Sequence, residues 1–167
     1  AGCMAQLYQA YKELNGGSNP SSALMKCVVL NSADDLGNPG PDFKHGWGEI
    51  NVLRGLTILE NNNYESGTIS QGNDEDHVIN VPAGTKEIKV MVYWHDKEAS
   101  TNASIALVND LDITLTSPTG TIIYPWVLDP TPNSSILNTP AIQGVDDLNN
   151  MEQVTIKNPA AGAYTLT

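Results

Sequence analysis

The hydrophobic pattern of the chain changes its period once, close to residue 63. Before that point apolar residues recur every three to four positions, which predicts helices over residues 1–14, 21–33 and 50–61. After it apolar and polar residues alternate, which predicts the strands GTISQ, HVINV, KEIKVMVYWH, LDITLTS, GTIIYPW, QVTIKN and AYTLT. No helical pattern interrupts these strands. The expected fold class is therefore α+β, with three helices followed by an antiparallel β-sandwich.

Each expected helix has a predicted face and predicted ends. Gly16 and Gly17 should end the first helix, whose inward stripe would be Met4, Leu7, Tyr8, Tyr11 and Leu14. For the second helix we expect Ser18 or Asn19 as the N-cap and Pro20 in the first turn. Its inward residues would be Leu24, Cys27, Val28 and Leu30, and the third helix should bring together Ile50, Leu53, Leu56 and Leu59.

Charge is distributed unevenly between the two halves of the chain. The net charge is −11, which argues against nucleic acid as a partner because phosphate binding needs a basic surface. Residues 1–62 carry 6 acidic and 4 basic side chains, whereas residues 63–167 carry 13 acidic and 4 basic ones. We therefore predict two domains, 1–62 and 63–167. No stretch of the sequence is apolar over a length that would span a membrane.

The chain has two cysteines, Cys3 and Cys27. Both lie in expected helices, where they could be small buried apolar residues or a disulfide pair. Because the helical pattern is already under way at Ala1 and the strand pattern continues to Thr167, we expect the chain to be part of a longer polypeptide.

The segment VNDLDITLTSP, residues 108–118, places two carboxylates beside an apolar alternation. A strand would put Asp110 and Asp112 on one face and Leu111, Ile113 and Leu115 on the other, in the core. Calcium prefers oxygen ligands, so the predicted metal ligands are Asn109, Asp110, Asp112 and, from a neighbouring strand end, Asp96. The alternative is that the two aspartates cap a turn and face solvent.

Two further acidic runs occur in the second half. Asp74, Glu75 and Asp76 are most simply a solvated loop. Asp146 and Asp147 form the other run, and possible oxygen ligands follow at Asn149, Asn150 and Glu152. We treat this second run as a separate, weaker candidate for metal binding.

Aromatic residues give a different functional hypothesis, carbohydrate binding. Tyr124 and Trp126 are two positions apart, so a strand would present both rings on one face. Exposed rings of this kind stack on sugars. Tyr and Trp in a sandwich are also commonly packed inward, as we expect for Trp94.

The stretch from Ala23 to Leu56, ALMKCVVLNSADDLGNPGPDFKHGWGEINVLRGL, resembles the sequence that follows the catalytic serine in subtilisin-like serine peptidases. HGWGEIN matches the family's pattern [HY]-G-[WY]-G-x-[IV]-[ND]. The second half of the chain resembles the jelly-roll β-sandwich appended to some secreted subtilases. The segments that carry this resemblance are KVMVYWHD, VNDLDITLTSPTG, NNMEQVTI and NPAAGAYTLT. This half is also similar in placement to the P domain of kexin-type convertases.

The resemblance implies that the chain is the C-terminal part of a secreted serine endopeptidase. Helices of the catalytic domain would be followed by an accessory sandwich, which in this family often carries calcium. The partners implied are the rest of the catalytic domain and protein or peptide substrates. The family's G-T-S-x-A-x-P motif is absent, and His45 lies outside a catalytic H-G-T-H motif. We expect no catalytic residue here and no activity from the chain alone.

Overall fold

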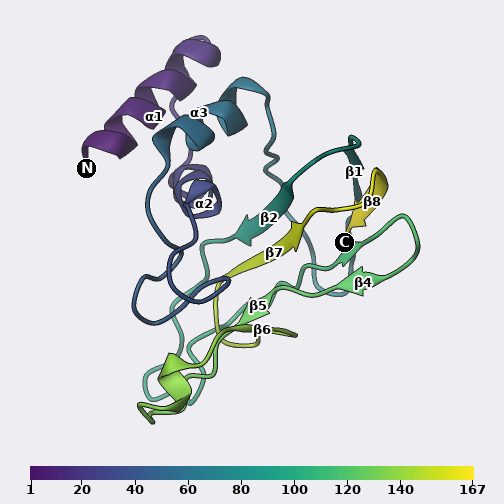
Figure 1. Ribbon diagram of the computed structural model, residues 1–167. Helices are drawn as coiled ribbons and strands as arrows, with labels where there is room; N and C mark the ends of the chain where they lie inside the picture. The colour runs from purple at the N-terminus through teal and green to yellow at the C-terminus, as the bar shows by residue number, and fades with distance from the viewer. The chain divides into compact units, whose positions relative to one another are not determined.

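A computed structural model describes all residues, 1–167, and the chain forms two compact units. The helical unit consists of residues 1–67 and 129–140, and the β unit of residues 68–128 and 141–167. The three α-helices and most of the strands are labelled in Figure 1. None of the helices has the length and hydropathy needed to cross a bilayer.

The helical unit contains α1 (Gly2–Leu14), α2 (Ser22–Ser32), α3 (Val52–Glu60) and the short 3-10 helix η1 (Ile136–Asn138). α1 and α2 both pack against α3. Its buried core is formed by Leu7, Leu24, Met25, Val28 and Leu59. Gly55 lies at the contact between α1 and α3, where an added Cβ would stand 3.2 Å from both methyl groups of Leu7. The small residue lets the two helices approach closely.

The ends of the helices confirm some predictions and correct one. Gly16 and Gly17 have φ values of 61° and 88° and terminate α1, as predicted. The predicted cap of α2 is wrong: Ser21 is the N-cap, and its hydroxyl accepts the N–H of Leu24 at 3.1 Å. Pro20 is buried just outside the helix. The run SNPSS contains several residues able to cap, so the sequence alone did not decide between them.

The face predicted for α3 is confirmed at Leu59, which is buried, and at Leu56, which packs against the core, and it is wrong at Ile50 and Leu53. Leu53 is 74% exposed and Ile50, which precedes the helix, is 42% exposed. The face that meets α1 and α2 is centred on Gly55, with Val52 and Leu59 one turn to either side. In α1, Leu7 is buried, whereas Met4, Tyr8 and Leu14 remain exposed.

The β unit is built from antiparallel pairs. A four-stranded sheet has the order β1 (His77–Val81), β8 (Gly162–Leu166), β3 (Leu115–Thr116), β4 (Ile122–Ile123). A second sheet pairs β2 (Glu87–Tyr93) with β7 (Met151–Lys157), with Val92 opposite Glu152. β5 (Trp126–Val127) pairs with β6 (Ile142–Gln143). The core is drawn from both larger sheets: Val81, Ile88, Ile113, Leu115, Val154 and Tyr164.

The α+β class with three helices and antiparallel sheets is thus confirmed. The strand predictions for HVINV, KEIKVMVYWH, QVTIKN and AYTLT are confirmed in position, whereas GTISQ forms no strand. LDITLTS contributes only Leu115–Thr116 to a named strand, although Thr114 exchanges two backbone hydrogen bonds with Thr167. Ile113 and Leu115 are buried, as expected, and Leu111 is half-buried.

Candidate functional site

Asp96 and Asn109, two of the predicted calcium ligands, form a hydrogen-bonded clamp. The Asp96 carboxylate accepts the backbone N–H groups of Val108 at 2.6 Å, Asn109 at 3.0 Å and Lys97 at 2.8 Å. It also accepts the side-chain amide of Asn109 at 2.7 Å. These donors, the Val108 N–H first among them, hold the pKa of Asp96 below its ordinary value. Three of the donors reach Oδ1 and the Val108 N–H reaches Oδ2, so the carboxylate ties residues 96–97 to residues 108–109.

Glu152 on β7 is a fully buried carboxylate, with 0% of its surface exposed. Its Oε2 accepts the backbone N–H of Ile113 at 2.8 Å, whereas its Oε1 is buried without any hydrogen-bond partner. Burial raises the pKa of Glu152 to about 8; the Ile113 N–H opposes this rise, and the nearby charges of Asp112, Asp146 and Asp110 add to it. These three aspartates therefore lie near enough for their charges to act on Glu152.

The structure brings together two acidic pairs that the sequence keeps far apart. Burial, followed by the charges of Asp112, Asp147 and Asp146, raises the pKa of Asp110. A side-chain hydrogen bond with Asp147 adds a smaller rise to the pKa of Asp110. We call the five carboxylates Asp110, Asp112, Asp146, Asp147 and Glu152 the acidic cluster.

Asp146 is the second buried member of the acidic cluster, with 3% exposed. Its Oδ1 accepts the backbone N–H groups of Leu148 at 2.9 Å and Asn149 at 3.3 Å, and its Oδ2 accepts the Asn149 amide at 2.7 Å. Asp110, Asp112 and Asp147 are exposed. Asp146 thus stabilises the turn that follows it.

All side-chain oxygens of the acidic cluster are carboxylate oxygens, the ligand type that hard divalent cations prefer. As the side chains stand, no three His, Cys, Asp or Glu residues are gathered closely enough to hold a metal ion. The predicted ligands Asp110 and Asp112 belong to the acidic cluster, and Asp96 and Asn109 belong to the clamp. The link to Glu152 is the hydrogen bond from the Ile113 N–H across 39 positions of sequence, which local sequence patterns did not reveal.

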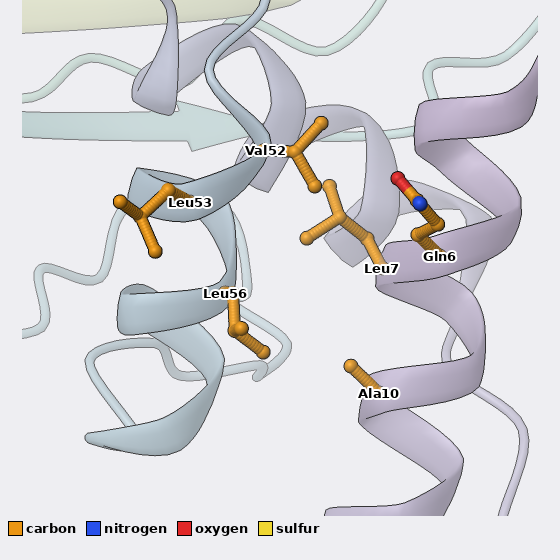
Figure 2. Close-up of a pocket in the computed structure, with 6 residues that line it drawn as sticks. All are labelled: Gln6, Leu7, Ala10, Val52, Leu53 and Leu56. Atoms are coloured by element: carbon orange, nitrogen blue, oxygen red, sulfur yellow. The ribbon is translucent and has the colours of Figure 1, made fainter.

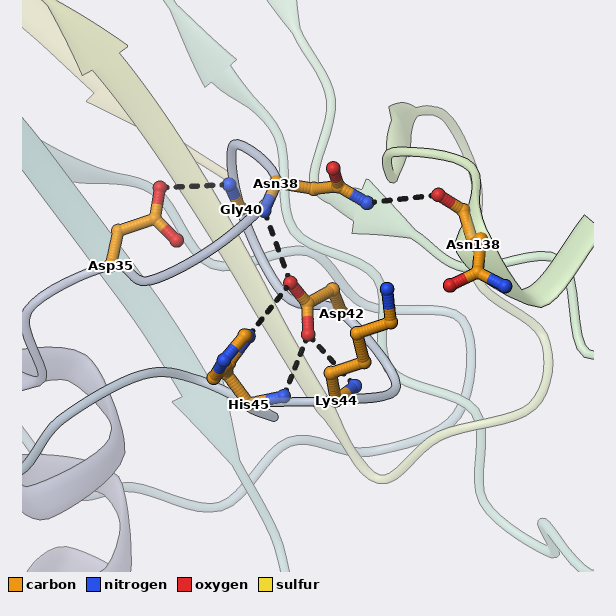
Figure 3. Close-up of polar contacts among 7 residues, drawn as sticks. All are labelled: Asp35, Asn38, Gly40, Asp42, Lys44, His45 and Asn138. Atoms are coloured by element: carbon orange, nitrogen blue, oxygen red, sulfur yellow. Dashed lines mark hydrogen bonds and ion pairs between the residues drawn. The ribbon is translucent and has the colours of Figure 1, made fainter.

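Asp42 organises the loop that contains His45 (Figure 3). It is 5% exposed, and it accepts the backbone N–H groups of His45 at 2.7 Å, Lys44 at 2.8 Å and Asn38 at 3.1 Å. These bonds, the one from His45 first, hold the pKa of Asp42 well below its ordinary value. The His45 ring lies 3.4 Å from the same carboxylate. Both the backbone N–H and the ring of His45 therefore contact Asp42, within the same loop.

The structure explains why several positions of the motif HGWGEIN hold the residue types that they do. Gly46 and Gly48 have φ values of 60° and 106°, in the left-handed region that favours glycine. A Cβ on Gly48 would collide with the carbonyl oxygen of Asp34, because Asp34 and Glu49 form an antiparallel bridge. Asn51 is the N-cap of α3, and its side-chain oxygen accepts the N–H of Arg54 at 2.9 Å.

A shallow groove lies between α1 and α3 in the helical unit (Figure 2). Its lining is mostly apolar: Gln6, Leu7 and Ala10 come from α1, and Val52, Leu53 and Leu56 from α3. The groove holds no titratable or nucleophilic side chain. It can offer contact area but no chemistry.

Tyr124 and Trp126, the predicted carbohydrate platform, flank the buried Pro125. Tyr124 is 40% exposed, whereas Trp126 is half-buried and its indole N–H is enclosed without a partner. Carbohydrate binding at these rings stays a prediction. The two cysteines, Cys3 and Cys27, do not form a disulfide with each other.

Comparison with known proteins adds no family to this description. Neither a scan against protein-family models nor a search of curated proteins gives a match to the chain.

Proposed function

We propose that this chain supplies the last helices of the catalytic domain and an accessory β unit of a secreted subtilisin-like serine endopeptidase. The observation that carries the proposal is the HGWGEIN loop. Its two glycines have positive φ, and its final asparagine caps α3. Three of the residues that make this stretch resemble the family, Gly46, Gly48 and Asn51, are therefore ones that its backbone favours.

The helical arrangement supports the same proposal. α1 has no acidic residue in its first turn, so the positive end of its dipole is not neutralised by a side chain. In the proposed parent enzyme, the N-terminal end of this helix would hold the reactive serine and favour the developing oxyanion. α2 and α3 would hold α1 in place through the core of Leu7, Met25 and Leu59.

The chain alone is proposed to be inactive. A serine peptidase needs a serine, a histidine to accept its proton and a carboxylate to orient that histidine. His45 has a carboxylate partner in Asp42, but the four contacts of that carboxylate lie within one loop. We therefore assign proteolysis to the parent enzyme and not to residues of this chain.

A serine-directed fluorophosphonate probe tests the peptidase origin. We expect the probe to label the full-length polypeptide at a serine that precedes Ala1 in a G-T-S-x-A-x-P motif, and to leave residues 1–167 alone unlabelled. The control is the full-length protein with that serine changed to alanine. Absence of the motif from the parent, or labelling of the isolated chain, would refute the proposal.

The β unit is proposed to stabilise the catalytic domain or to steer substrates. Val154→Ala in the parent would weaken the β unit, because Val154 is 0% exposed. Val78→Ala, at a position 65% exposed, is the matched control. Faster thermal inactivation would indicate stabilisation. A lower kcat/KM for a protein substrate, with no change for a short chromogenic peptide, would indicate steering. A parent unaffected on both measures would contradict both roles.

A further inference from the structure

The chain contains a single Asp-Pro dipeptide, formed by Asp129 and Pro130. The two residues follow β5, lie outside any helix or strand, and are both exposed. At this point the chain passes from the β unit into the segment 129–140 of the helical unit. Water and acid therefore reach the peptide bond that joins the two residues.

Thr131, the residue after the dipeptide, fixes the side chain of Asp129. The Oδ1 atom of Asp129 accepts the backbone N–H of Thr131 at 2.9 Å. When a side chain accepts the N–H two residues ahead, the turn so closed encloses the peptide bond between the two residues. Asp129 forms no ion pair that would draw its carboxylate elsewhere. The carboxylate is therefore held across the bond between Asp129 and Pro130.

Thr131 also keeps the carboxyl group of Asp129 ionised. Its hydroxyl, followed by its backbone N–H, holds the pKa of Asp129 below the ordinary value of 3.8. The carboxylate is the nucleophilic form of the side chain. It therefore persists to a lower pH here than it does in an ordinary aspartate.

Pro130 supplies a nitrogen that can leave but cannot compete. Because proline has no N–H, its nitrogen cannot attack the Asp129 side chain to form a cyclic imide, which is the usual side reaction of aspartate. The nitrogen of a tertiary amide also accepts a proton more readily than that of a secondary amide. In acid, attack on the backbone carbonyl is therefore the favoured reaction of this dipeptide.

We propose that Asp129 cleaves its own peptide bond to Pro130 in mild acid and that the two products stay paired in the β unit. A carboxylate oxygen of Asp129 forms a bond to the backbone carbonyl carbon of the same residue, an intramolecular attack that correct positioning favours. The C–N bond breaks, and its electron pair leaves with the Pro130 nitrogen, which takes a proton from the acid. Water then opens the cyclic anhydride, so the net reaction is hydrolysis into residues 1–129 and 130–167.

Strand pairing is the reason why the products should stay together. Each strand that follows the cleaved bond pairs with a strand that precedes it: β6 with β5, β7 with β2, and β8 with both β1 and β3. Val154 and Tyr164 from the second product are buried in one core with Val81 and Leu115 from the first. The proposal does not depend on a peptidase origin.

Incubation of the chain at pH 4, with circular dichroism to verify the folded state, tests the reaction. Mass spectrometry should find residues 1–129 and 130–167, whose masses add up to the parent plus a water molecule. Concentrated urea at the same pH removes the turn at Thr131. It should slow cleavage about fivefold, which corresponds to about 1 kcal/mol, the contribution of one hydrogen bond. Equal or faster cleavage in urea, or no product from the folded chain, would overturn the proposal.

Size-exclusion chromatography tests whether the products stay paired. The cleaved chain should elute at the volume of the intact chain and should separate into two bands only in SDS. Two separate peaks under native conditions would contradict the pairing of the products.

Substitutions at exposed positions identify the nucleophile and the leaving nitrogen. Asp129→Glu keeps the charge but moves the carboxylate by one methylene group, and Pro130→Ala restores an N–H to the leaving nitrogen. Each should slow cleavage at least about tenfold, because small misplacements of reacting groups have effects of this size or larger. Asp74→Glu, at another exposed aspartate, is the matched control and should cleave as the parent does. Unchanged cleavage in Asp129→Glu or Pro130→Ala, or equal slowing in Asp74→Glu, would refute the assignment.

Discussion

Arg54 and Asp34 form an ion pair in which Nη2 and Oδ1 lie 2.7 Å apart, joining the first turn of α3 to the segment that follows α2. Asn51 completes this contact, because its amide donates to the other oxygen of Asp34 at 2.9 Å. The same asparagine caps α3 through the N–H of Arg54. One side chain therefore fixes both the start of α3 and its attachment to the preceding loop.

Asn51→Ala should remove both contacts. Loss of an N-cap lowers the free energy of unfolding by about 1 kcal/mol and up to about 2 kcal/mol. Urea unfolding followed by helical circular dichroism measures the change. Asn61→Ala, at the other end of α3 where φ is −89°, is the control and should stay within about 0.5 kcal/mol of the parent. Equal effects at both positions would contradict the capping role.

Gly48→Ala should be more damaging than Gly46→Ala, although both glycines have positive φ. A methyl group at position 46 meets no atom within 4 Å, whereas one at position 48 collides with the Asp34 carbonyl. The expected loss at position 46 is about 1 kcal/mol for the backbone alone, and at position 48 at least about 2 kcal/mol. Urea midpoints of the two variants give the comparison. A larger loss at position 46 would show that a shift of the backbone at Asp34 relieves the clash.

Leu59→Ala and Leu53→Ala form a matched pair on one helix. Leu59 is 1% exposed and Leu53 is 74% exposed. We expect Leu59→Ala to cost about 2–5 kcal/mol through the cavity that it leaves, and Leu53→Ala to cost less than about 0.5 kcal/mol. Thermal unfolding of both variants measures this difference. Similar losses would mean that α3 buries a different face in solution.

The protein should lose stability as the pH rises from 5 to 8. The pKa of Glu152 is raised from its ordinary 4.5 to about 8, so over this range the folded state binds more protons than the unfolded state. The stabilising contribution is complete below pH 4.5 and is lost as the pH passes 8. Asp42 and Asp96 have lowered pKa values, and their contributions are lost only below their ordinary value of 3.8.

Urea midpoints measured in EDTA at pH 5 and pH 8 follow this change. Glu152→Gln is the control, because it carries no titratable group at the site and should show a smaller dependence on pH. A parent whose stability increases from pH 5 to pH 8 by more than that of Glu152→Gln would contradict the raised pKa.

Cys27 should react slowly with iodoacetamide in the folded chain. Burial raises the pKa of its thiol to about 11, and the thiolate is the form that reacts. The variant Cys3→Ser isolates Cys27, and mass spectrometry follows the labelling at pH 8. We expect slow labelling without denaturant and a large acceleration in concentrated urea. Equal rates in the two conditions would show that α2 does not bury this thiol.

Local patterns predicted the elements well where the physical cause is local. The alternation in HVINV and the paired glycines after α1 act within a few residues, and both predictions hold. The face of α3 that meets the other helices is instead centred on Gly55. The apolar pattern does not reveal this position, because glycine has no apolar side chain. The sequence predicted two separate candidates for metal binding, one around Asp110 and Asp112 and one around Asp146, Asp147 and Glu152. Their connection was missed because Glu152 meets Ile113 across 39 positions of sequence. Long-range contacts of this kind depend on strand register, and register is set by packing.

Residues 129–140 belong to the helical unit, although the chain enters them from the β unit and returns to it afterwards. The side-chain amide of Asn38 donates a hydrogen bond of 3.1 Å to the carbonyl oxygen of Asn138 in this segment (Figure 3). A protease that cuts once after Gly67 would leave this part of the helical unit on the larger product. The two products would then share noncovalent contacts even after cleavage. Expression of either unit as a separate protein therefore calls for redesigned connections, and a simple truncation will not isolate it.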